Sequence, residues 1–336
     1  MTLEEKGVAL SDWFDANMRD LPWRHTRDPY CIWVSEIMLQ QTRVETVLDY
    51  YDRFLARFPT AEALAAADWD AVAKAWEGLG YYRRAKYLLL GAQSLMKDHG
   101  GVFPRTAEEL KKIPGIGEYT AGAIAAQAFG ERAAAVDGNV LRVMTRLENL
   151  EDSIDLPATR QKVGALSVRM MPQGRAWSHT QALMELGATV CTPTGPRCEA
   201  CPLREACEAK RLGKTELLPR KNPKNKPVPV ERTVILLVEG GKVWLRRRPE
   251  DGLLAGMWEF PAREDGLAGT WEVLAEGPGH RHVFTHRVWQ MRSVFARPVI
   301  GPEGGLWADE AELTALPLPS AMEPFRQAIL EKWRQV

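Results

Sequence analysis

The sequence predicts a two-domain protein in which an all-α domain precedes a smaller α+β domain. Its 336 residues are 45 % hydrophobic and 26 % charged, which is ordinary for a globular chain. At about 150 residues per domain, this length gives two domains. As far as about Lys214, apolar residues recur at the three- and four-residue spacing of helices, whereas strand-like segments follow residue 230. A stretch rich in Pro and Lys separates the two patterns.

The helical domain is predicted over residues 1–218. Alanine is abundant in residues 61–75 and 121–128, which favours helix. Pro and Gly interrupt the pattern often enough to indicate about ten short helices. Residues 219–230 contain too few apolar side chains to pack, so we predict an extended linker there.

The second domain is predicted over residues 231–336. Residues 232–238 and 242–248 flank Glu239-Gly240-Gly241, which is typical of a β-hairpin. Residues 282–295 are predicted to form one long strand. Residues 320–335 carry apolar side chains at helical spacing and predict a closing helix. Together these segments indicate a compact α+β fold.

The net charge is zero, with 44 basic and 44 acidic residues, which by itself argues against nucleic-acid binding through bulk positive charge. The charge is unevenly distributed, however. Residues 111–230 hold 18 basic and 12 acidic side chains, whereas the segments on either side are acidic overall. The sequence has no apolar run of about 18 residues, and residues 1–14 lack a signal-peptide pattern, so we expect neither a membrane span nor secretion.

Four of the five cysteines lie within one short segment, at Cys191, Cys198, Cys201 and Cys207. Their C-x6-C-x2-C-x5-C spacing can enclose a zinc ion or an iron–sulfur cluster. Zinc sites usually contain two C-x2-C pairs and this segment contains one, so the spacing favours a cluster over zinc and over a chance group of thiols. Residues 210–226 add seven basic residues against one acid, which indicates either a phosphate-facing surface or a solvated charge run.

Residues 110–130 place Pro114-Gly115-Ile116-Gly117 between two predicted helices, the second of which starts near Glu118. Gly115 and Gly117 permit close backbone approach, and the amides that open the second helix can face a phosphate. An ordinary corner between helices fits the same pattern. Asp137 stands at the predicted start of the next helix, where it is an N-cap, a chemically active group, or both.

The hairpin, Asp137 just beyond it and the four-cysteine segment downstream together resemble the endonuclease III superfamily of helix-hairpin-helix DNA glycosylases. Residues 21–24 (LPWR), 33–42 (WVSEIMLQQT) and 78–85 (GLGYYRRA) further resemble its adenine DNA glycosylase family. The resemblance implies an all-α glycosylase fold, a [4Fe-4S] cluster on the four cysteines, and contacts of Gly115 and Gly117 with the DNA backbone. Bifunctional members carry a lysine amine where this chain has Tyr119, so a monofunctional enzyme that uses water is implied.

Removal of adenine breaks an N-glycosidic bond, and two carboxyl groups suit this reaction: one protonates the leaving base and the other stabilises a cationic sugar. Glu36 lies in the apolar segment 32–39, where it is either a surface residue of an amphipathic helix or a carboxyl group that resists ionisation. The resemblance implies that Glu36 protonates N7 of adenine and later helps to activate water, while Asp137 stabilises the sugar. It also implies that Tyr119 and Asn139 position Asp137 and the sugar.

The resemblance assigns further residues to the DNA, because the adenine must leave the base stack before it reacts. Gln41 and Tyr81 match residues that wedge into the duplex. Thr42 is assigned with them to substrate binding. Five residues match positions that line the adenine pocket: Arg19, Trp23, Arg24, Leu39 and Gln181. The carbonyl groups of Lys111, Ile113 and Ile116 match a site for a monovalent cation or calcium at the hairpin.

Residues 253–261 (LLAGMWEFP) resemble Nudix domains. The segment that follows lacks the Glu-rich REx2EE core that would hold magnesium, so we interpret the domain as a binding module and not as a hydrolase. The resemblance implies that it recognises 8-oxoguanine through Phe284, Thr285 and His286. The family pattern has Ser at the second of these positions, and Thr285 keeps the hydroxyl group but adds a methyl group.

The sequence therefore predicts a glycosylase that removes adenine mispaired with 8-oxoguanine or guanine in double-stranded DNA. We expect a monomer without a membrane partner, located with the nucleoid in the bacterial cytoplasm. One alternative is an endonuclease III-like glycosylase and lyase for oxidised pyrimidines, against which Tyr119 argues. Another is a non-catalytic iron–sulfur protein that binds DNA, which leaves Glu36 and the C-terminal domain unexplained.

Overall fold

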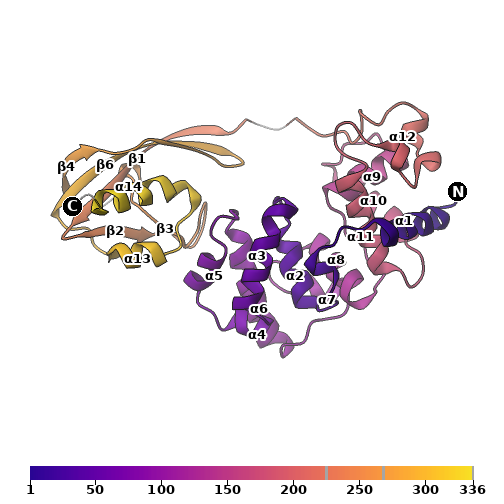
Figure 1. Ribbon diagram of the computed structural model, residues 1–336, viewed down its shortest axis with the longest axis horizontal. Helices are drawn as coiled ribbons and strands as arrows, with labels where there is room; N and C mark the ends of the chain where they lie inside the picture. Colours follow the sequence, from indigo (N-terminus) through magenta and orange to yellow (C-terminus); the bar gives the residue numbers. More distant parts are fainter. Residues whose placement is uncertain (224–225, 267–268, 335–336) are drawn as a thin grey trace. The chain divides into compact units, whose positions relative to one another are not determined.

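The computed structural model describes residues 1–223, 226–266 and 269–334 (Figure 1). The chain divides into two compact units, Met1–Ala66 with Tyr87–Pro223, and Ala67–Lys86 with Lys224–Val336. Residues 67–86 fall inside the helical domain predicted over residues 1–218, but in the structure they group with the C-terminal residues. Within the described ranges, none of the helices combines the length and the apolar character that a bilayer crossing requires.

The first unit is helical, as the spacing of its apolar residues predicts. Local signals start several helices: Thr2 and Glu5 form a capping box, and Asp28 caps a helix whose first residue is Pro29. The α-helices that lie wholly in this unit are α1 (Leu3–Asn17), α2 (Pro29–Met38), α3 (Val44–Arg57), α4 (Ala61–Ala65), α7 (Ala107–Leu110), α8 (Glu118–Phe129), α9 (Gly138–Leu147), α10 (Pro157–Met170), α11 (Ala176–Thr189) and α12 (Glu208–Arg211). Short 3-10 turns are η1 (Pro22–Arg24), η2 (Cys198–Ala200) and η3 (Arg204–Ala206).

Two close backbone contacts hold the helices around the site. Helix α8 packs against α2 and α11, and α9 also packs against α11. A Cβ atom at Gly122 of α8 would lie 1.9 Å from the carbonyl oxygen of Ala134, so only glycine fits there. At Gly187 of α11, a Cβ atom would lie 2.5 Å from Cβ of Asn139. Glycine at these two positions therefore permits the approach of the segments that carry the predicted site.

The second unit contains a mixed sheet. Its strands are β1 (Val228–Glu239), β2 (Lys242–Arg247), β3 (Trp258–Glu259), β4 (Thr270–Glu276), β5 (His280–Val283), β6 (Arg287–Ile300) and β7 (Leu306–Ala308). Among the described residues, the strand order is β3-β2-β1-β6-β4, with β5 paired to β6 and β7 paired to β2. Strands β1 and β2 form the predicted antiparallel hairpin, whereas β1 and β6 run parallel.

The prediction of one strand over residues 282–295 is wrong. The run is divided between β5 and β6, which pair antiparallel with Val283 opposite Val288. Residues 284–286 form the turn, closed by a hydrogen bond from the Phe284 amide to the Arg287 carbonyl oxygen. Pairing the two halves satisfies backbone groups that a single strand would leave open at the sheet edge.

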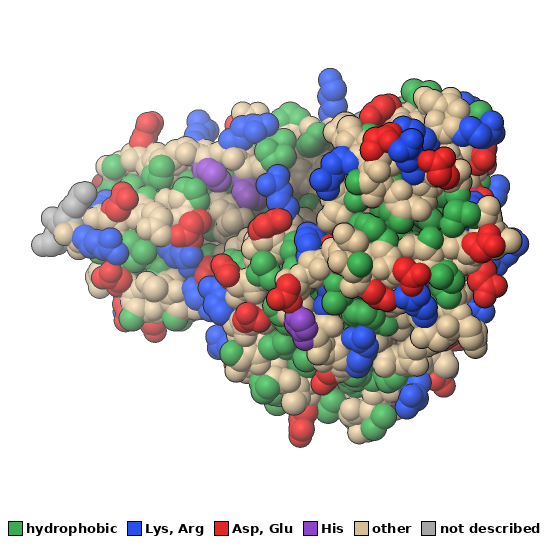
Figure 2. Space-filling model, turned by 45° about the vertical axis from the view of Figure 1, so that its right-hand side comes forward, with side chains coloured by type: hydrophobic (Ala, Val, Ile, Leu, Met, Phe, Trp, Pro, Cys, Tyr) green, Lys and Arg blue, Asp and Glu red, His purple; other side chains and the backbone are tan. Residues whose placement is uncertain are grey.

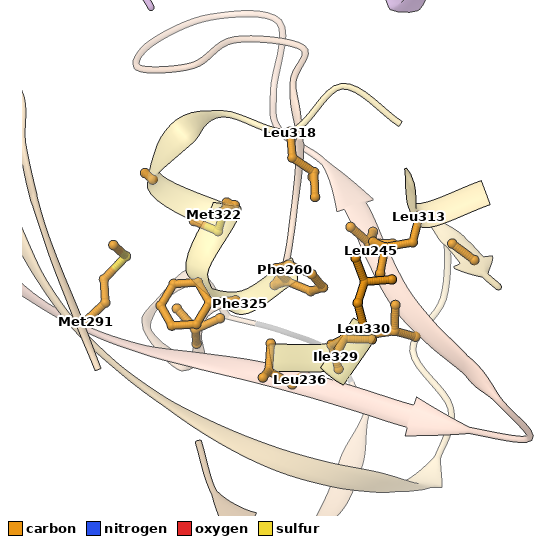
Figure 3. Packing of buried hydrophobic residues seen from close by; sticks show 14 of the residues in the cluster. Leu236, Leu245, Phe260, Met291, Leu313, Leu318, Met322, Phe325, Ile329 and Leu330 are labelled. Carbon is orange, nitrogen blue, oxygen red and sulfur yellow. The ribbon is translucent and has the colours of Figure 1, made fainter. Parts of the chain in front are cut away.

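The predicted closing helix over residues 320–335 begins as a 3-10 turn, η5 (Ser320–Met322), and continues as α14 (Glu323–Arg334). Gln335 lies outside the described residues. Figure 3 shows Leu236 of β1, Leu245 of β2 and Ile329 of α14 meeting in the core of this unit, and all three are fully buried. Helix α13 (Glu310–Ala315) adds Leu313 to this core.

Residues 67–86 join the second unit through polar contacts. They contain α5 (Trp69–Ala75) and the first residues of α6 (Arg83–His99). Trp69 Nε1 donates a 3.1 Å hydrogen bond to the carbonyl oxygen of Gly256. Glu77 accepts from the amide of Leu318 at 3.2 Å and pairs with Arg326 at 2.9 Å. A segment that carries Tyr81 is thereby bound to the domain that carries Thr285.

Candidate active site and cysteine loop

Glu36 is buried on α2, with 2 % of its surface exposed. The Tyr119 hydroxyl of α8 donates a short hydrogen bond to Glu36 Oε2, and Gln127 Nε2, two turns further along α8, donates to Oε1 at 2.7 Å. Burial raises the pKa of Glu36, which outweighs the lowering by these two hydrogen bonds. Glu36 is thus a buried carboxyl group that retains its proton to higher pH than an exposed one.

Asp137 is the N-cap of α9, as its place in the sequence predicts. Its Oδ1 accepts from the Val140 amide at 2.7 Å, and its Oδ2 accepts from Asn139 Nδ2 at 2.8 Å. Burial raises the pKa of Asp137, and these hydrogen bonds partly offset the rise. The charge of Asp137 in turn raises the pKa values of Glu36 and Tyr119, so the two carboxyl groups belong to one electrostatic site.

The partner of Tyr119 in the structure differs from the one that the sequence suggests. The resemblance places it with Asp137 and the sugar, whereas in the structure its hydroxyl group contacts Glu36. Burial raises the pKa of Tyr119 well above 10, with further contributions from the charges of Glu36 and Asp137. The side chain is therefore a neutral phenol, which can both donate and accept a hydrogen bond.

Two residues of the predicted adenine pocket meet at an acid that sequence reasoning missed. Arg24 Nη2 and Arg19 Nη2 lie 2.7 Å and 2.8 Å from Glu185 Oε2. Burial opposes ionisation of Glu185, but the hydrogen bonds from the two arginines prevail and lower its pKa to about 2. Gln181 accepts from Arg24 Nε at 3.2 Å and donates to Gln127 Oε1 at 2.6 Å. The structure thus joins three of the predicted pocket residues to Glu36 through Gln127.

The other predicted pocket residues have simpler surroundings. Trp23 is buried, with its ring edge-to-face on Tyr51 at 5.4 Å between centroids. Leu39 caps the C-terminus of α2, next to Met38, and is partly buried. Gln127 and Glu185 were missed because a single sequence cannot show which helices meet. The available signal was a glutamine inside the apolar run of residues 121–129.

The two predicted wedge residues share an uncommon backbone conformation. Gln41 has φ of 59° and Tyr81 has φ of 50°, the left-handed region that non-glycine residues rarely adopt. Both side chains are exposed, and Tyr81 exposes 49 % of its surface. Such strain concentrates at functional sites, where the surrounding structure maintains it. Thr42 follows Gln41, and its amide donates to the carbonyl oxygen of Leu39 at 3.4 Å.

The predicted hairpin is present. Gly115 has φ of 84°, and a Cβ atom there would lie 2.7 Å from Cβ of Tyr87, so glycine is required. Gly117 is the N-cap of α8, and a Cβ atom there would point into open space. Of the predicted cation ligands, the Ile113 carbonyl oxygen accepts the Ile116 amide at 3.1 Å. The cation contacts of Lys111, Ile113 and Ile116 stay a prediction.

The four cysteines of residues 191–207 are free thiols and line one common cavity. Arg146 also lines it, and its Nη1 donates to Cys191 Sγ at 3.3 Å. Within the described ranges, no three His, Cys, Asp or Glu side chains are gathered closely enough to hold a single metal ion. Four cysteine sulfurs thus line one cavity, which is the donor set that iron–sulfur clusters use.

The basic run of residues 210–226 is largely paired with acids. Lys210 pairs with Glu199 at 3.0 Å, Arg211 pairs with Glu208 at 2.6 Å, and Lys214 pairs with Glu151 at 2.5 Å. Lys224 of this run lies outside the described residues. On the face in Figure 2, basic and acidic side chains are interspersed. A phosphate would compete with these carboxylates for the cations.

The predicted lesion-reading residues occupy the turn between β5 and β6. The Phe284 ring packs edge-to-face on Trp289 at 4.9 Å between centroids, which fixes the turn to the core. Thr285 and His286 are exposed. The hydroxyl oxygens of Thr285 and Tyr81 lie 3.5 Å apart, although 204 residues separate them. The second unit therefore brings a predicted wedge residue and a predicted lesion reader together.

Arginines surround one acid within the Nudix-like segment and one that follows it. Glu259 is fully buried and pairs with Arg246 at 2.9 Å and Arg248 at 2.6 Å. Asp265 pairs with Arg246 and Arg232, each at 2.5 Å. Guanidinium groups thus neutralise these carboxylates, and the sequence lacks the REx2EE core that would hold magnesium. The geometry favours a binding module.

Comparisons with known proteins agree with both units. Residues 34–167 match the family model of HhH-GPD superfamily base excision DNA repair proteins, and residues 233–328 match that of NUDIX domains. A thermostable thymine-DNA glycosylase is similar in structure, with a TM-score of 0.56, 31 % identity, and coverage of 62 % of this chain and 97 % of that chain. The structure of endonuclease III in a trapped DNA complex is also similar, with a TM-score of 0.53 and 24 % identity. The match covers 63 % of this chain and 99 % of that chain, and it supports the fold.

The fold and the site define a helix-hairpin-helix base excision DNA repair protein with an added Nudix-like domain. Among curated relatives, adenine DNA glycosylases from Arabidopsis thaliana and Homo sapiens are 40 % and 36 % identical, each over 76 % of this chain. The chain spans 47 % and 56 % of their lengths, or about half. The adenine DNA glycosylase of Buchnera aphidicola subsp. Acyrthosiphon pisum is 32 % identical over 74 % of this chain and 72 % of its own length. The chain belongs to the adenine DNA glycosylase family.

Proposed function

We propose that the protein removes adenine mispaired with 8-oxoguanine or guanine from double-stranded DNA, as a monomeric glycosylase of the bacterial nucleoid. The observation that carries the proposal is the buried group formed by Glu36, Tyr119 and Asp137. It supplies one buried carboxyl group with a raised pKa, a second carboxyl group held at a helix N-terminus, and no amine nucleophile at position 119. Hydrolysis of an N-glycosidic bond needs this combination.

The reaction begins with proton transfer from Glu36 Oε2 to N7 of adenine. The N-glycosidic bond then breaks, and its electron pair leaves with the neutral base. Asp137, fixed by Val140 and Asn139, stabilises the positive charge that develops at C1′ of the sugar. Water adds to C1′, and the proton that it releases goes to the Glu36 carboxylate, which restores the acid. Tyr119 remains a neutral phenol throughout and keeps its hydrogen bond with Glu36 Oε2.

Replacement of Glu36 by Gln tests this mechanism, because the amide keeps the shape of the side chain and cannot supply the proton. We expect the single-turnover excision rate to fall by at least about 100-fold, with binding to the mispaired duplex retained. Excision is detected as an alkali-sensitive site at the adenine. Wild-type turnover in this variant would show that another group is the acid.

Tyr119 also separates this function from the lyase alternative. An endonuclease III-like lyase would form a covalent imine with the sugar, which borohydride reduces to a stable protein–DNA adduct. We expect no such adduct on a duplex that contains adenine opposite 8-oxoguanine. A trapped adduct would favour the lyase. A duplex left intact by alkali would instead favour the non-catalytic DNA-binding alternative.

We propose that Cys191, Cys198, Cys201 and Cys207 hold a [4Fe-4S] cluster. Such a cluster fixes the fold of a loop without itself entering the glycosidic reaction. The guanidinium of Arg146 supplies a hydrogen bond to one ligand sulfur, and all four cysteines line one shared cavity. About four iron atoms per chain, with broad visible absorption, are expected. A colourless protein with one zinc would contradict the cluster.

We also propose that the turn of residues 284–286 reads 8-oxoguanine. The contact between Tyr81 and Thr285 supports this, since the turn lies beside the exposed residue that we assign to the duplex. A truncated chain that ends near residue 225 is a poor test, because residues 67–86 would lose their partners in the C-terminal unit. Replacement of Thr285 by Ala in the full chain avoids this problem. We expect the preference for 8-oxoguanine over guanine to decrease.

A further inference from the structure

Three buried side chains connect Glu36 to the ionised Glu185. Gln127 Nε2 donates to Glu36 Oε1 at 2.7 Å, and Gln181 Nε2 donates to Gln127 Oε1 at 2.6 Å. Arg24 Nε donates to Gln181 Oε1 at 3.2 Å, and Arg24 Nη2 donates to Glu185 Oε2 at 2.7 Å. None of the five residues exposes more than 6 % of its surface. Solvent therefore does not compete for these hydrogen bonds.

Arg24 fixes the direction of each hydrogen bond in this series of side chains. A guanidinium group can only donate, so Gln181 must present its oxygen to Arg24 and its NH2 group to Gln127. Gln127 must then present its oxygen to Gln181 and its NH2 group to Glu36. Rotating either amide by 180° would place a donor against a donor in a buried site, where water cannot satisfy either group.

This polarity distinguishes the two oxygens of Glu36. Oε1 faces an amide that can only donate, and a donated N–H group favours the carbonyl oxygen of a carboxylic acid over its hydroxyl oxygen. Oε2 faces the Tyr119 hydroxyl, which can rotate to donate or to accept. The arrangement therefore tolerates the acidic proton on Oε2 in every orientation of Tyr119 and disfavours it on Oε1.

We propose that Gln127 is a positioning residue whose amide, oriented through Gln181 and Arg24, keeps the transferable proton of Glu36 on Oε2. The proposal rests on the proposed role of Glu36 as the acid. When the O–H bond at Oε2 breaks and the base takes the proton, Gln127 and Tyr119 both donate to the carboxylate that remains. The same amide thus orients the acid before transfer and stabilises its conjugate base afterwards.

The pH dependence of this step involves few groups. Those that act on Glu36 are Tyr119 and Gln127 of α8, Asp137 at the start of α9, and Arg24 of η1. Asp137 raises the pKa of Glu36 by its charge, and Arg24 lowers it. Neither changes when Gln127 is replaced by an uncharged residue such as Met, so a shift in the pH profile of that variant reports on the lost amide donor.

The test is the Gln127→Glu variant, because glutamate has the same shape as glutamine. One oxygen of the new carboxyl group can still accept from Gln181, and the other then faces Glu36 Oε1. Two carboxyl groups in contact share a proton, which would be held between them and away from Oε2. Single-turnover excision of adenine opposite 8-oxoguanine is measured from pH 5 to 9, with binding to the same duplex as the check on folding. Gln161→Glu on the exposed side of α10 is the matched control.

We expect Gln127→Glu to lower the maximum rate by about 100-fold, the scale of a general-acid contribution, and to move the alkaline limb to higher pH. The control should match the wild type. If Gln127→Glu does not fold, Gln127→Met removes the donor without adding charge and should still move the alkaline limb upward. An unchanged profile and rate in the folded variant would overturn the proposal.

A parallel measurement on Glu36→Gln distinguishes a failure of the proposed role of Glu36 as the acid from a failure of the proposed role of Gln127. Wild-type turnover in that variant overturns the role of Glu36 and the proposal with it. An inactive Glu36→Gln protein combined with a Gln127→Glu profile like that of the wild type overturns only the positioning role of Gln127.

Discussion

Arg142 joins Asn139 to the cysteine loop. Its Nη2 donates to Asn139 Oδ1 at 2.8 Å, and its Nε donates to the carbonyl oxygen of Cys191 at 2.7 Å. Asn139 in turn donates to Asp137, so three hydrogen bonds lead from a cysteine backbone to the proposed stabilising carboxylate. Hydrogen bonds therefore connect the cysteine loop to Asp137, although Cys191 follows Asp137 by 54 residues in the sequence.

Replacement of Arg142 by Met should impair both ends of this link. The substitution retains much of the buried volume but removes every donor, so Asn139 Oδ1 loses its Arg142 partner and the Cys191 carbonyl oxygen keeps the longer 3.4 Å bond from Arg146 but loses the shorter one. We expect the single-turnover excision rate to fall by about tenfold or more, together with lower iron content. Arg169→Met on the exposed side of α10 is the control. Full activity and iron content in Arg142→Met would contradict the coupling.

Gly187→Ala tests the position of Asn139 directly. A Cβ atom at Gly187 would lie 2.5 Å from Cβ and 3.0 Å from Cα of Asn139, so the backbone at the start of α9 must shift. Because a displacement of about 1 Å at a reacting group can cost about 100-fold in rate, we expect a large loss of excision. Gly164→Ala of α10 is the matched control, because its Cβ atom would make an ordinary contact at 3.4 Å. Equal activity of the two variants would show that Asn139 does not need its observed position.

Tyr81→Phe tests the contact with Thr285. The hydroxyl oxygens lie 3.5 Å apart in an exposed position, so their hydrogen bond contributes little to stability. We expect an unchanged melting temperature and a reduced preference for 8-oxoguanine over guanine. Comparison of excision rates on the two mispairs measures the effect. Tyr87→Phe, at another partly exposed tyrosine, is the control. An unchanged preference would assign lesion reading to Thr285 without help from Tyr81.

His179 predicts how stability depends on pH. The side chain is fully buried in α11, and burial lowers its pKa from the ordinary 6.5 to about 4. Between these values the unfolded chain binds a proton that the folded chain excludes, so the free energy of unfolding decreases as the pH falls from about 6.5 to about 4. The contribution is fully present above pH 6.5 and amounts to roughly 3 kcal/mol.

The measurement is denaturant unfolding of the wild type and His179→Leu at pH 7.5, 5.5 and 4.5. The difference in stability between the two proteins should change in favour of the variant as the pH falls. Parallel curves for wild type and His179→Leu would show that His179 accepts a proton in the folded state.

Much of the fold could be predicted because it depends on local patterns. The change from helical to alternating spacing predicted two kinds of fold, and Gly115 and Asp137 marked a turn and a helix start that the structure contains. The division of residues 282–295 into two strands could not be predicted, because an alternating run has the same spacing with or without a turn. The grouping of residues 67–86 with the C-terminal unit depends on long-range contacts such as that of Trp69 with Gly256.

The sequence alone determined the class of each domain, the cysteine spacing and the hairpin, since these depend on residue type and on neighbours a few positions apart. The two carboxyl groups were proposed from the resemblance to a glycosylase family. Only the tertiary structure decided how Glu36 is held. Gln127 lies 91 residues from Glu36 and Gln181 lies 54 residues from Gln127, and their amides meet because α2, α8 and α11 pack together. A buried polar group must find its partner wherever the packing places one, and spacing along the chain does not reveal that place.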